Sequence, residues 1–585
     1  MKQSVFNLNT LKAHPERNAF DLTHNDVFSC APGMLLPISC TEVLPNEHYE
    51  INPQIFLRTM PLNSAAFVRM RQHVEFFFIP MRVLCRQFNQ FVVGTKYPMS
   101  SLSTLNDFDK SLPSITLAQL RKWYVASGNT PDAHSIPLKF GAQRLLDLLG
   151  YGFSSARPVT ADNYPDSYAL DSTTQDSPKV SLFRLAAYQK IFQDYYRNPY
   201  WESANASAFN LDDKFGISLT ADADKSRLNE ILQIRYRNWS KDYFTSVQPS
   251  FQGAPFVTKT VDMSKTKINA FDITDSFKPD SPMSYVDQKL PVSGPDVMAF
   301  RTSALTAFYG SDQGQLAIPV HNIRAAFALD KLYRLQQQSG NGSYGEQIRN
   351  RFGFGGVHDD WKAVYLGGSS SPVSISEVIT TANTQASAGA PVTLGQTGDI
   401  YGKASSVNDA KIAFDTKEHG IIMGIFSVVP DADYNSFGID MHNFKLNFEQ
   451  FYQPEFDRLG HQPLNVYALT CLSPSMTSDS KHWLQRVIGF QNRYIEYKTG
   501  IDKVHGQFCT GGTLSAWSAP RNTGLLLSTS GTGFNGNSLK VSPKILNSIC
   551  SVAFEGEENT DPILVDSHIS IKAIRPMSVS DEPLL

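Results

Sequence analysis

The stretch VEFFFIP, from Val74 to Pro80, decides the class of fold. Its residues are apolar apart from Glu75, and Pro80 ends the run. A strand that is exposed on one face alternates apolar and polar side chains, whereas a strand that is buried on both faces is apolar nearly throughout. The stretch is as short as most strands and is rich in phenylalanine, which strands favour. We therefore predict a β-strand with both faces buried.

Further strand-like runs lie near the other end of the chain. GIIMGIFSVVP (420–430) and NVYALTCL (465–472) are short apolar runs, and residues 569–573 alternate apolar and polar side chains. Aromatic residues make up 11% of the chain, and 37 Gly and 33 Pro supply turns. This mixture favours short strands over a helical protein. We expect a mainly β protein whose strands come mainly from residues 20–95 and 415–575.

Helical patterns fall between these ends. Ser181–Arg197 places leucine and aromatic side chains near one stripe, with Ser181 as the expected N-cap and Asn198-Pro199 as the stop. Ile323–Gln338 shows a similar pattern and ends at a Ser-Gly pair. We interpret both segments as helices that connect strands.

Two long stretches lack any periodicity. Residues 251–318 and 368–412 are rich in Ser, Thr, Gly, Asp and Pro, a composition typical of long surface loops. We therefore expect one domain over residues 1–585. Within it, residues 96–250 form a helical and loop insertion, residues 251–318 a surface protrusion, and residues 319–414 a helical connector with a variable loop.

The composition argues against several classes of protein. The 52 basic and 55 acidic residues give a net charge of −3, so the chain as a whole is no polycation that coats nucleic acid. No apolar run is long enough to cross a membrane, and the first residues show no secretory signal. The six cysteines lack the CxxC spacing of a zinc site. We expect reduced, mostly buried thiols.

Sequence motifs for catalysis are missing. HExxH, GxSxG and GxxxxGK(S/T) do not occur. GxGxxG occurs at Gly340 and at Gly531, but the first copy follows a helical pattern and the second lies in a polar loop, so we interpret both as turns. His358-Asp359-Asp360 offers too few oxygen ligands for a calcium loop. We expect no enzyme, no cofactor, and no catalytic, cofactor-binding or metal-binding residues.

Two groups of residues are candidates for contact with DNA. Arg235, Arg237 and Trp239 lie where basic and aromatic side chains alternate, a combination that can neutralise phosphates and stack on bases. The alternative is a structural segment whose arginines serve packing. The second group lies on the N-terminal segment, which has little periodicity, and consists of Lys2, Lys12 and Arg17.

Seven segments resemble one family of proteins closely, and they follow the family order along the chain. They are FDLTHNDVFSCAPGMLLPISCTEVLPNEHYEINPQIFLRTMPL (20–62), VEFFFIPMRVLCRQFNQF (74–91), RLAAYQKIFQDYYRN (184–198), YRNWSKDYFTS (236–246), IRAAFALDKLYRLQQQSGNGSYGEQIRNRFGF (323–354), EHGIIMGI (418–425) and GFQNRYIEYKTGIDKVHG (489–506). They are similar to the major capsid proteins of the gokushovirus-like Microviridae, small tailless bacteriophages with single-stranded DNA. Cys85 departs from the family pattern, in which many members carry tryptophan.

The resemblance implies an eight-stranded antiparallel jelly roll, a viral capsid β-barrel with long loop and helical insertions. It implies self-assembly through pentamer contacts into a T=1 icosahedral shell around a circular single-stranded DNA genome. The implied partners are other copies of the chain, the genome, small DNA-binding and scaffolding phage proteins, and a bacterial surface receptor bound by exposed loops for host attachment. The protein would assemble in the host cytoplasm and belong to the virion, without membrane insertion.

A second interpretation from another class explains the same composition. A β-sandwich carbohydrate-binding protein or glycoside-active enzyme would also be rich in aromatic residues and turns. Such a protein would run as a monomer or a small oligomer, whereas a shell protein forms a large assembly. Particle size therefore distinguishes the two.

Overall fold

The computed structural model describes residues 17–64, 66–86, 88–93, 112–127, 130–132, 134–153, 178–212, 222–249, 331, 361–379, 400–457, 461–471, 486–521, 539–556, 560–577 and 579. The chain divides into two units, residues 1–250 with 359–585 and residues 251–358. Apart from Lys331, the second unit lies outside the described residues. Several predictions fall outside the described residues: the protrusion, the helix at Ile323–Gln338, both GxGxxG copies and the His358 cluster. The single domain and the protrusion stay predictions.

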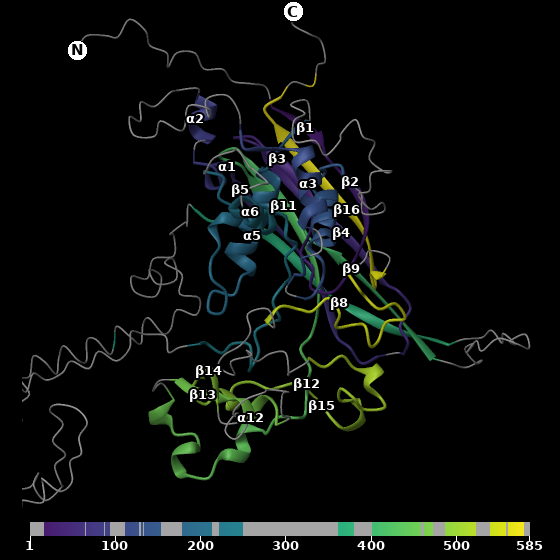
Figure 1. Cartoon of the computed structure of the whole chain (residues 1–585), viewed down its shortest axis with the longest axis vertical. Helices are drawn as coiled ribbons and strands as arrows, with labels where there is room; N and C mark the ends of the chain where they lie inside the picture. The colour runs from purple at the N-terminus through teal and green to yellow at the C-terminus, as the bar shows by residue number, and fades with distance from the viewer. Residues whose placement is uncertain are drawn as a thin grey trace, which may run out of the picture. The chain divides into compact units, whose positions relative to one another are not determined.

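Within the described residues, ten strands form one antiparallel sheet in the order β1-β16-β4-β9-β8-β5-β11-β3, with β2 beside β16 and β10 beside β4 (Figure 1). Their bounds are β1 Asn18–Asp21, β2 His24–Cys30, β3 Leu36–Val43, β4 His48–Thr59, β5 Met70–Pro80, β8 Val364–Ile379, β9 Ile400–Asp409, β10 Ile412–Asp415, β11 Gly420–Pro430 and β16 Ile563–Arg575.

The strands pair in nested order. β5 pairs with β8, β4 with β9, β3 with β11, and β1 and β2 with β16, so each pair encloses the previous one along the chain. β8 joins two halves of the sheet, because residues up to Val373 pair with β5 and residues from Ser374 pair with β9. With β1 and β2 counted as one interrupted edge strand, and the short β10 left out, the halves have four strands each. This confirms the predicted eight-stranded antiparallel jelly roll.

The predicted strand at Val74–Ile79 is the centre of β5, and both of its faces are buried. Phe76 and Phe78 pack into the core between the two halves of the sheet, whereas Phe77 and Ile79 pack on the other side, into a second core formed with helices. β11, beside it, is buried along its whole length for the same reason. The apolar character of both strands thus reflects a layer of structure on each side.

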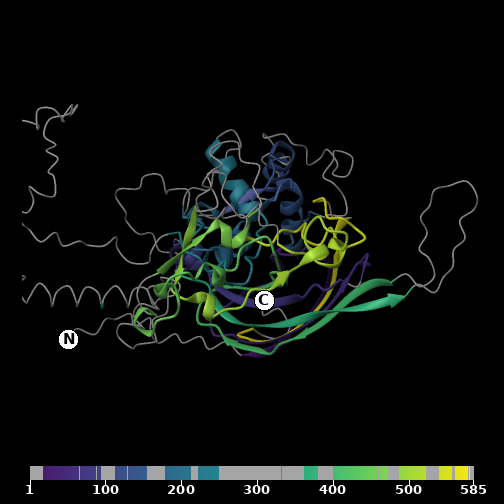
Figure 2. The same cartoon turned by 90° about the horizontal axis from the view of Figure 1, so that it is seen from below.

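Helices cover the outer side of the half that contains β5 and β11 (Figure 2). They are α1 Met81–Leu84, α2 Phe88–Val93, α3 Leu117–Ser127, α4 Leu138–Leu148, α5 Phe183–Ile191 and α6 Asp222–Leu232, with the short strands β6 Ser114–Thr116 and β7 Lys179–Ser181 among them. α5 contacts β5 and β11 directly. A buried ion pair ties α4 to the start of the last strand, since Arg144 Nη2 lies 2.7 Å from Asp561 Oδ2.

The helix predicted at Ser181–Arg197 is present with different ends. α5 begins at Phe183 because Ser181 is the last residue of β7, although the Ser181 hydroxyl still accepts a hydrogen bond from the Phe183 N–H. The helix continues as a π-helical turn, η3 Phe192–Tyr196, and stops where Arg197 becomes extended, directly before the predicted Asn-Pro stop.

The surface loop predicted at 368–412, which is also the variable loop predicted within 319–414, is wrong for most of its described residues. β8 and β9 occupy both sides of the stretch and supply two strands of the barrel. The serines of these strands give the stretch the composition of a loop, but two of them form hydrogen bonds inside the barrel. Gln72 Nε2, which is fully buried, donates to Ser371 Oγ at 2.8 Å and to Ser406 Oγ at 2.9 Å. In this part of the barrel interior, hydrogen-bonded polar side chains take the place of apolar ones.

A separate lobe, residues 431–521, lies between β11 and β16 in sequence and appears green in Figure 1. Its elements are β12 Tyr434–Asn435, η6 Met441–Phe444, η7 Phe448–Gln450, η8 Pro454–Phe456, β13 His461–Asn465, α12 Val466–Leu469, β14 Val487–Asn492, η10 Ile495–Tyr497, β15 Lys503–Val504, η11 Gly506–Phe508 and η12 Ser515–Trp517. The strand predicted at 465–472 is wrong, because residues 466–469 form the helical turn α12. We call residues 431–521 the β11–β16 lobe.

The six cysteines are free thiols, and Cys30, Cys85, Cys509 and Cys550 are buried, as expected from the sequence. Burial raises the pKa of the Cys550 thiol to about 11, which keeps it protonated near neutral pH. Cys471 is exposed. In the part of the chain that the structure describes, no helix is long and apolar enough to cross a membrane.

Candidate functional site

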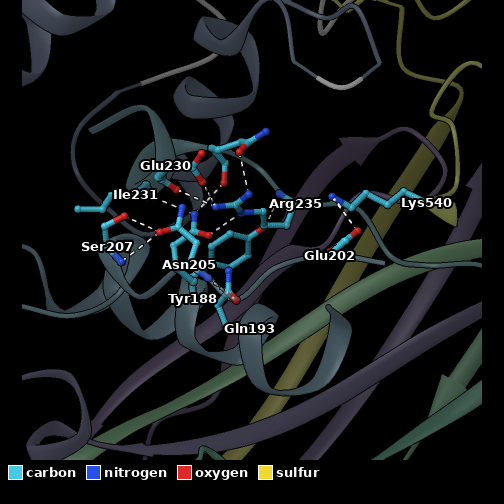
Figure 3. Close-up of polar contacts among 11 residues, drawn as sticks. Tyr188, Gln193, Glu202, Asn205, Ser207, Glu230, Ile231, Arg235 and Lys540 are labelled. Atoms are coloured by element: carbon cyan, nitrogen blue, oxygen red, sulfur yellow. Dashed lines mark hydrogen bonds and ion pairs between the residues drawn. The ribbon is translucent and has the colours of Figure 1, made fainter. Parts of the chain in front are cut away.

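The Arg235 side chain points into the protein, where its guanidinium binds side chains of two neighbouring helices (Figure 3). Its Nε donates to Gln189 Oε1 on α5 at 2.7 Å, and its Nη2 lies 2.8 Å from Glu230 Oε2 on α6. The guanidinium also lies 5.0 Å from the centre of the Phe192 ring. Because a buried charge is tolerated only when it is paired and hydrogen-bonded, this arrangement fixes Arg235 as a link between α5 and α6.

Arg237 forms a second internal link, from the segment after α6 to the barrel. Its Nη1 donates to Glu75 Oε2 on β5 at 2.7 Å and to Ser427 Oγ on β11 at 3.1 Å, and its Nη2 donates to Glu75 Oε1 at 3.2 Å. The Tyr196 hydroxyl donates to the same carboxylate. Burial alone would raise the pKa of Glu75, but the charge of Arg237 and the hydrogen bonds from Arg237 and Tyr196 outweigh it and hold this pKa below its ordinary value.

Trp239 is buried where the barrel meets the β11–β16 lobe. Its backbone N–H donates to the Leu539 carbonyl at 3.0 Å, and the Arg521 guanidinium lies 5.2 Å from the centre of its ring. The side chains of Arg235, Arg237 and Trp239 are therefore all used in internal contacts. The structure favours the structural interpretation of this segment, and we do not place a DNA contact on these three residues.

The N-terminal candidates have a different setting. Arg17 is exposed and directly precedes β1, which lies at an edge of the sheet. Lys2 and Lys12 lie outside the described residues. The segment that carries all three is therefore attached at the edge of the half formed by β1, β2, β16, β4 and β9.

Among the residues that the structure describes, none forms a layer over one face of that half, which we call the bare face. Along β16, every second side chain from Leu564 to Ile574 points away from the core, and all but one of these are exposed. The strand register places Asp566 of β16 between Val27 of β2 and Phe56 of β4, and Phe56 in turn beside Val407 of β9. The alternation of apolar and polar residues in the middle of β16 could have identified most of these outward residues from the sequence.

The bare face mixes polar and apolar side chains and is nearly balanced in charge. One row across the strands carries the polar side chains of Asn25, His568 and Gln54. Further along β4, the Arg58 guanidinium lies 4.7 Å from the centre of the Phe56 ring. The cations Lys403 and Lys572 are offset by acidic residues such as Asp409 and Asp566. Such a surface offers hydrogen bonds and stacking rather than strong electrostatic attraction.

A cavity of about 500 Å³ opens in the β11–β16 lobe. Its rim carries three carboxylates, each paired with a cation of the same chain: Asp440 with Lys503 at 3.0 Å, Glu496 with Lys445 at 3.4 Å and Asp502 with Arg69 at 2.7 Å. These pairs favour a structural role for the rim. Among the residues described, no group of three or more His, Cys, Asp or Glu side chains is placed to hold a metal ion.

A nested eight-stranded jelly roll with long insertions is an architecture found in viral capsid proteins, and also in lectins and cupins. The sequence model of the family described as capsid protein (F protein) matches residues 9–122 and 153–583. The chain belongs to this family of phage capsid proteins. It is also 23% identical over 569 residues to the capsid protein VP1 of Chlamydia phage 1, covering 86% of this chain and 87% of that protein.

These comparisons confirm the resemblance to the gokushovirus-like Microviridae. Membership of a capsid family gives the chain a structural role in the virion, as one of many copies in a shell. The rival interpretation, a carbohydrate-binding protein or glycoside-active enzyme, gains no support from either comparison.

Proposed function

We propose that the chain is the major capsid protein that self-assembles into a T=1 icosahedral shell around a circular single-stranded DNA genome. The nested jelly roll of a phage capsid family is the observation that carries this proposal. The barrel is rigid because its two cores hold β5 and β11 from both sides. Its long insertions are available for contacts between copies, as in other jelly-roll shells.

We place the genome against the N-terminal segment and the bare face. The segment with Lys2, Lys12 and Arg17 leads into β1, an edge strand of the half that carries the bare face. With a net charge of −3, the chain cannot neutralise a genome by itself. Sparse local contacts, supplemented by small DNA-binding and scaffolding phage proteins in the host cytoplasm, fit this charge balance.

Removing the three N-terminal charges is expected to reduce packaged DNA several-fold while leaving shell formation unchanged. The variant carries Lys2→Gln, Lys12→Gln and Arg17→Gln, and Arg17, the described one of the three, precedes β1. Fewer cations on the segment release fewer counterions from DNA, which weakens binding. The measurement is nuclease-protected DNA per particle, beside particle yield.

A neutral variant of the same segment, Asn7→Gln with Asn9→Gln, serves as the control and should package DNA normally. Equal DNA content in the charge-removed variant and the wild type would show that the N-terminal segment does not contact the genome. A chain that yields no particles with protected DNA even as wild type would contradict the proposed function itself.

We further propose that residues 251–318 form the surface protrusion used for host attachment, with a bacterial surface receptor as the partner. Exposed variable loops on a rigid scaffold commonly carry recognition. The segment lies outside the described residues, and its support is its composition and its position between the family-like segments 236–246 and 323–354.

A further inference from the structure

The β11–β16 lobe exposes a group of large apolar side chains between η6 and η8. Leu446 is 83% exposed and Phe448 is 77% exposed, and Phe451 and Tyr452 are each about half exposed. Tyr497 of η10 joins this group, because its ring centre lies 6.1 Å from that of Tyr452. We call these five residues the lobe patch. Contiguous apolar surface of this kind marks interaction sites on soluble proteins.

The lobe patch stands on a backbone that local hydrogen bonds fix in place. Gln450 Oε1 accepts from the Leu446 N–H at 2.6 Å and from the Asn447 N–H at 2.9 Å. Asp440 accepts from the His442 N–H at 3.0 Å and so caps η6. A segment held in this way loses little further conformational freedom when a partner covers it, which favours binding.

The two lysines beside the lobe patch are paired with carboxylates. Lys445 lies 3.4 Å from Glu496, and its Nζ also sits 3.4 Å from the centre of the Tyr497 ring. Lys498 pairs with Asp457 at 2.7 Å. Nucleic acid binds to surplus positive charge, and these pairs leave little surplus beside the lobe patch. Aromatic side chains with few free charges are instead typical of the centre of a protein–protein interface.

The area of the lobe patch suits a contact between proteins. Buried aromatic side chains cover about 150–250 Å² each, so five large side chains that are half to four-fifths exposed offer on the order of 500 Å². A stable interface buries roughly 800 Å² on each partner, so the lobe patch would form more than half of one.

We propose that the lobe patch is a contact between copies of this chain, buried against a neighbouring copy in the shell. The inference rests on the proposed function, because a capsid chain meets other copies of itself over most of its rim. The neutral charge balance and the area of the lobe patch point to a protein partner. In a shell built of one major chain, that partner is a second copy.

The test compares assembly of the wild type with a variant that carries Leu446→Asp and Phe448→Asp. The protein concentration needed for assembly, measured by sedimentation, should rise at least tenfold in this variant. A conservative variant with Leu446→Met and Phe448→Leu should stay within about twofold of the wild type. Phe91→Asp with Val92→Asp, which places the same two charges at exposed apolar positions of α2, should also assemble normally.

A second measurement does not depend on any substitution. Hydroxyl-radical oxidation of residues 446–452 should fall several-fold when wild-type subunits assemble, because a neighbouring copy covers the lobe patch. Unchanged oxidation on assembly would overturn the inference, even if the charged variant failed to fold.

The outcomes separate this inference from the proposed function. If the wild type forms no large particles, the proposed function fails and the inference falls with it. If the wild type assembles and the charged variant does so at the same concentration, only the inference is overturned. A charged variant that assembles normally but loses packaged DNA would make the lobe patch a nucleic-acid contact instead. Equal loss of assembly in the variant with Phe91→Asp and Val92→Asp would show a general effect of added charge.

Discussion

Arg237→Ala is expected to lower the free energy of unfolding by about 3 kcal/mol, because it leaves the Glu75 carboxylate in a mostly buried position without its cation. Both side chains are about four-fifths buried, and their two hydrogen bonds of 2.7 and 3.2 Å join the segment after α6 to β5. Denaturant unfolding of the unassembled chain at neutral pH measures the effect.

A double variant, Arg237→Met with Glu75→Gln, provides the control. It removes both charges together, so it should recover part of the lost stability, since an unpaired buried charge is more costly than a neutral pair. Normal stability of Arg237→Ala together with reduced DNA packaging would contradict the structural role and return Arg237 to the DNA-contact candidates.

The same pair predicts how stability depends on pH. Because the folded protein holds the pKa of Glu75 below its ordinary value, the unfolded chain binds a proton more readily at this residue than the folded chain does. The stabilisation is therefore complete above the ordinary glutamate pKa of about 4.3 and is lost as the pH falls through the lowered pKa of the folded state. The Arg237→Ala variant should lack this part of the loss of stability at acid pH.

Replacing residues 255–312 with a short Gly/Ser linker is expected to give particles that assemble but adsorb to host cells at least tenfold less. The anchor points on both sides stay intact in this variant. Gln248 exchanges backbone hydrogen bonds of 2.9 and 2.7 Å with Phe490, and the Ala363 N–H donates to Asp194 Oδ2 at 2.9 Å. Removing a surface excursion beyond such anchors leaves the barrel and its cores unchanged.

Adsorption is measured by depletion of particles from a suspension of host cells, with particle yield as the control. Substituting a linker of the same length for residues 380–399, between β8 and β9, gives a matched variant with a different loop removed. Failed assembly of the 255–312 variant, with normal adsorption by any particles that form, would make this segment an interface between copies instead of an attachment loop.

β5 and β11 could be predicted from the sequence because their surroundings are apolar on both sides, so a continuous apolar run records their burial directly. β8 and β9 could not, because Ser371 and Ser406 meet Gln72 from a strand about 300 residues earlier. The hydroxyl groups of these serines find a hydrogen-bond partner that is distant in sequence, and only the folded structure shows that partner.

The candidate DNA contacts show the same limit. Basic residues next to aromatic residues have the same composition whether they stack on bases or pack inside a protein. The partner of Arg237 is Glu75, which is 162 positions away in sequence. The sequence left both interpretations open for Arg235, Arg237 and Trp239, and the contacts of the folded chain favour the structural one.

The lobe patch went unnoticed in the sequence for a related reason. Residues Leu446–Tyr452 (LNFEQFY) combine apolar and polar side chains without the period of a strand or a helix, so no rule assigns them to a core. In the structure, Phe448–Gln450 form the 3₁₀ turn η7, and the large apolar side chains of the segment face solvent. Aromatic residues in a stretch without period are the sequence signal that points to an exposed contact.

Electron microscopy of the purified wild-type chain, assembled with its scaffolding partners and single-stranded DNA, tests the central claim most directly. The account predicts closed icosahedral particles of roughly 60 copies of the 65.0 kDa chain, a protein mass on the order of 4 MDa, with the eight-stranded barrel in the wall of the shell. A chain that stays a monomer or small oligomer under these conditions, with no closed particles, would contradict it.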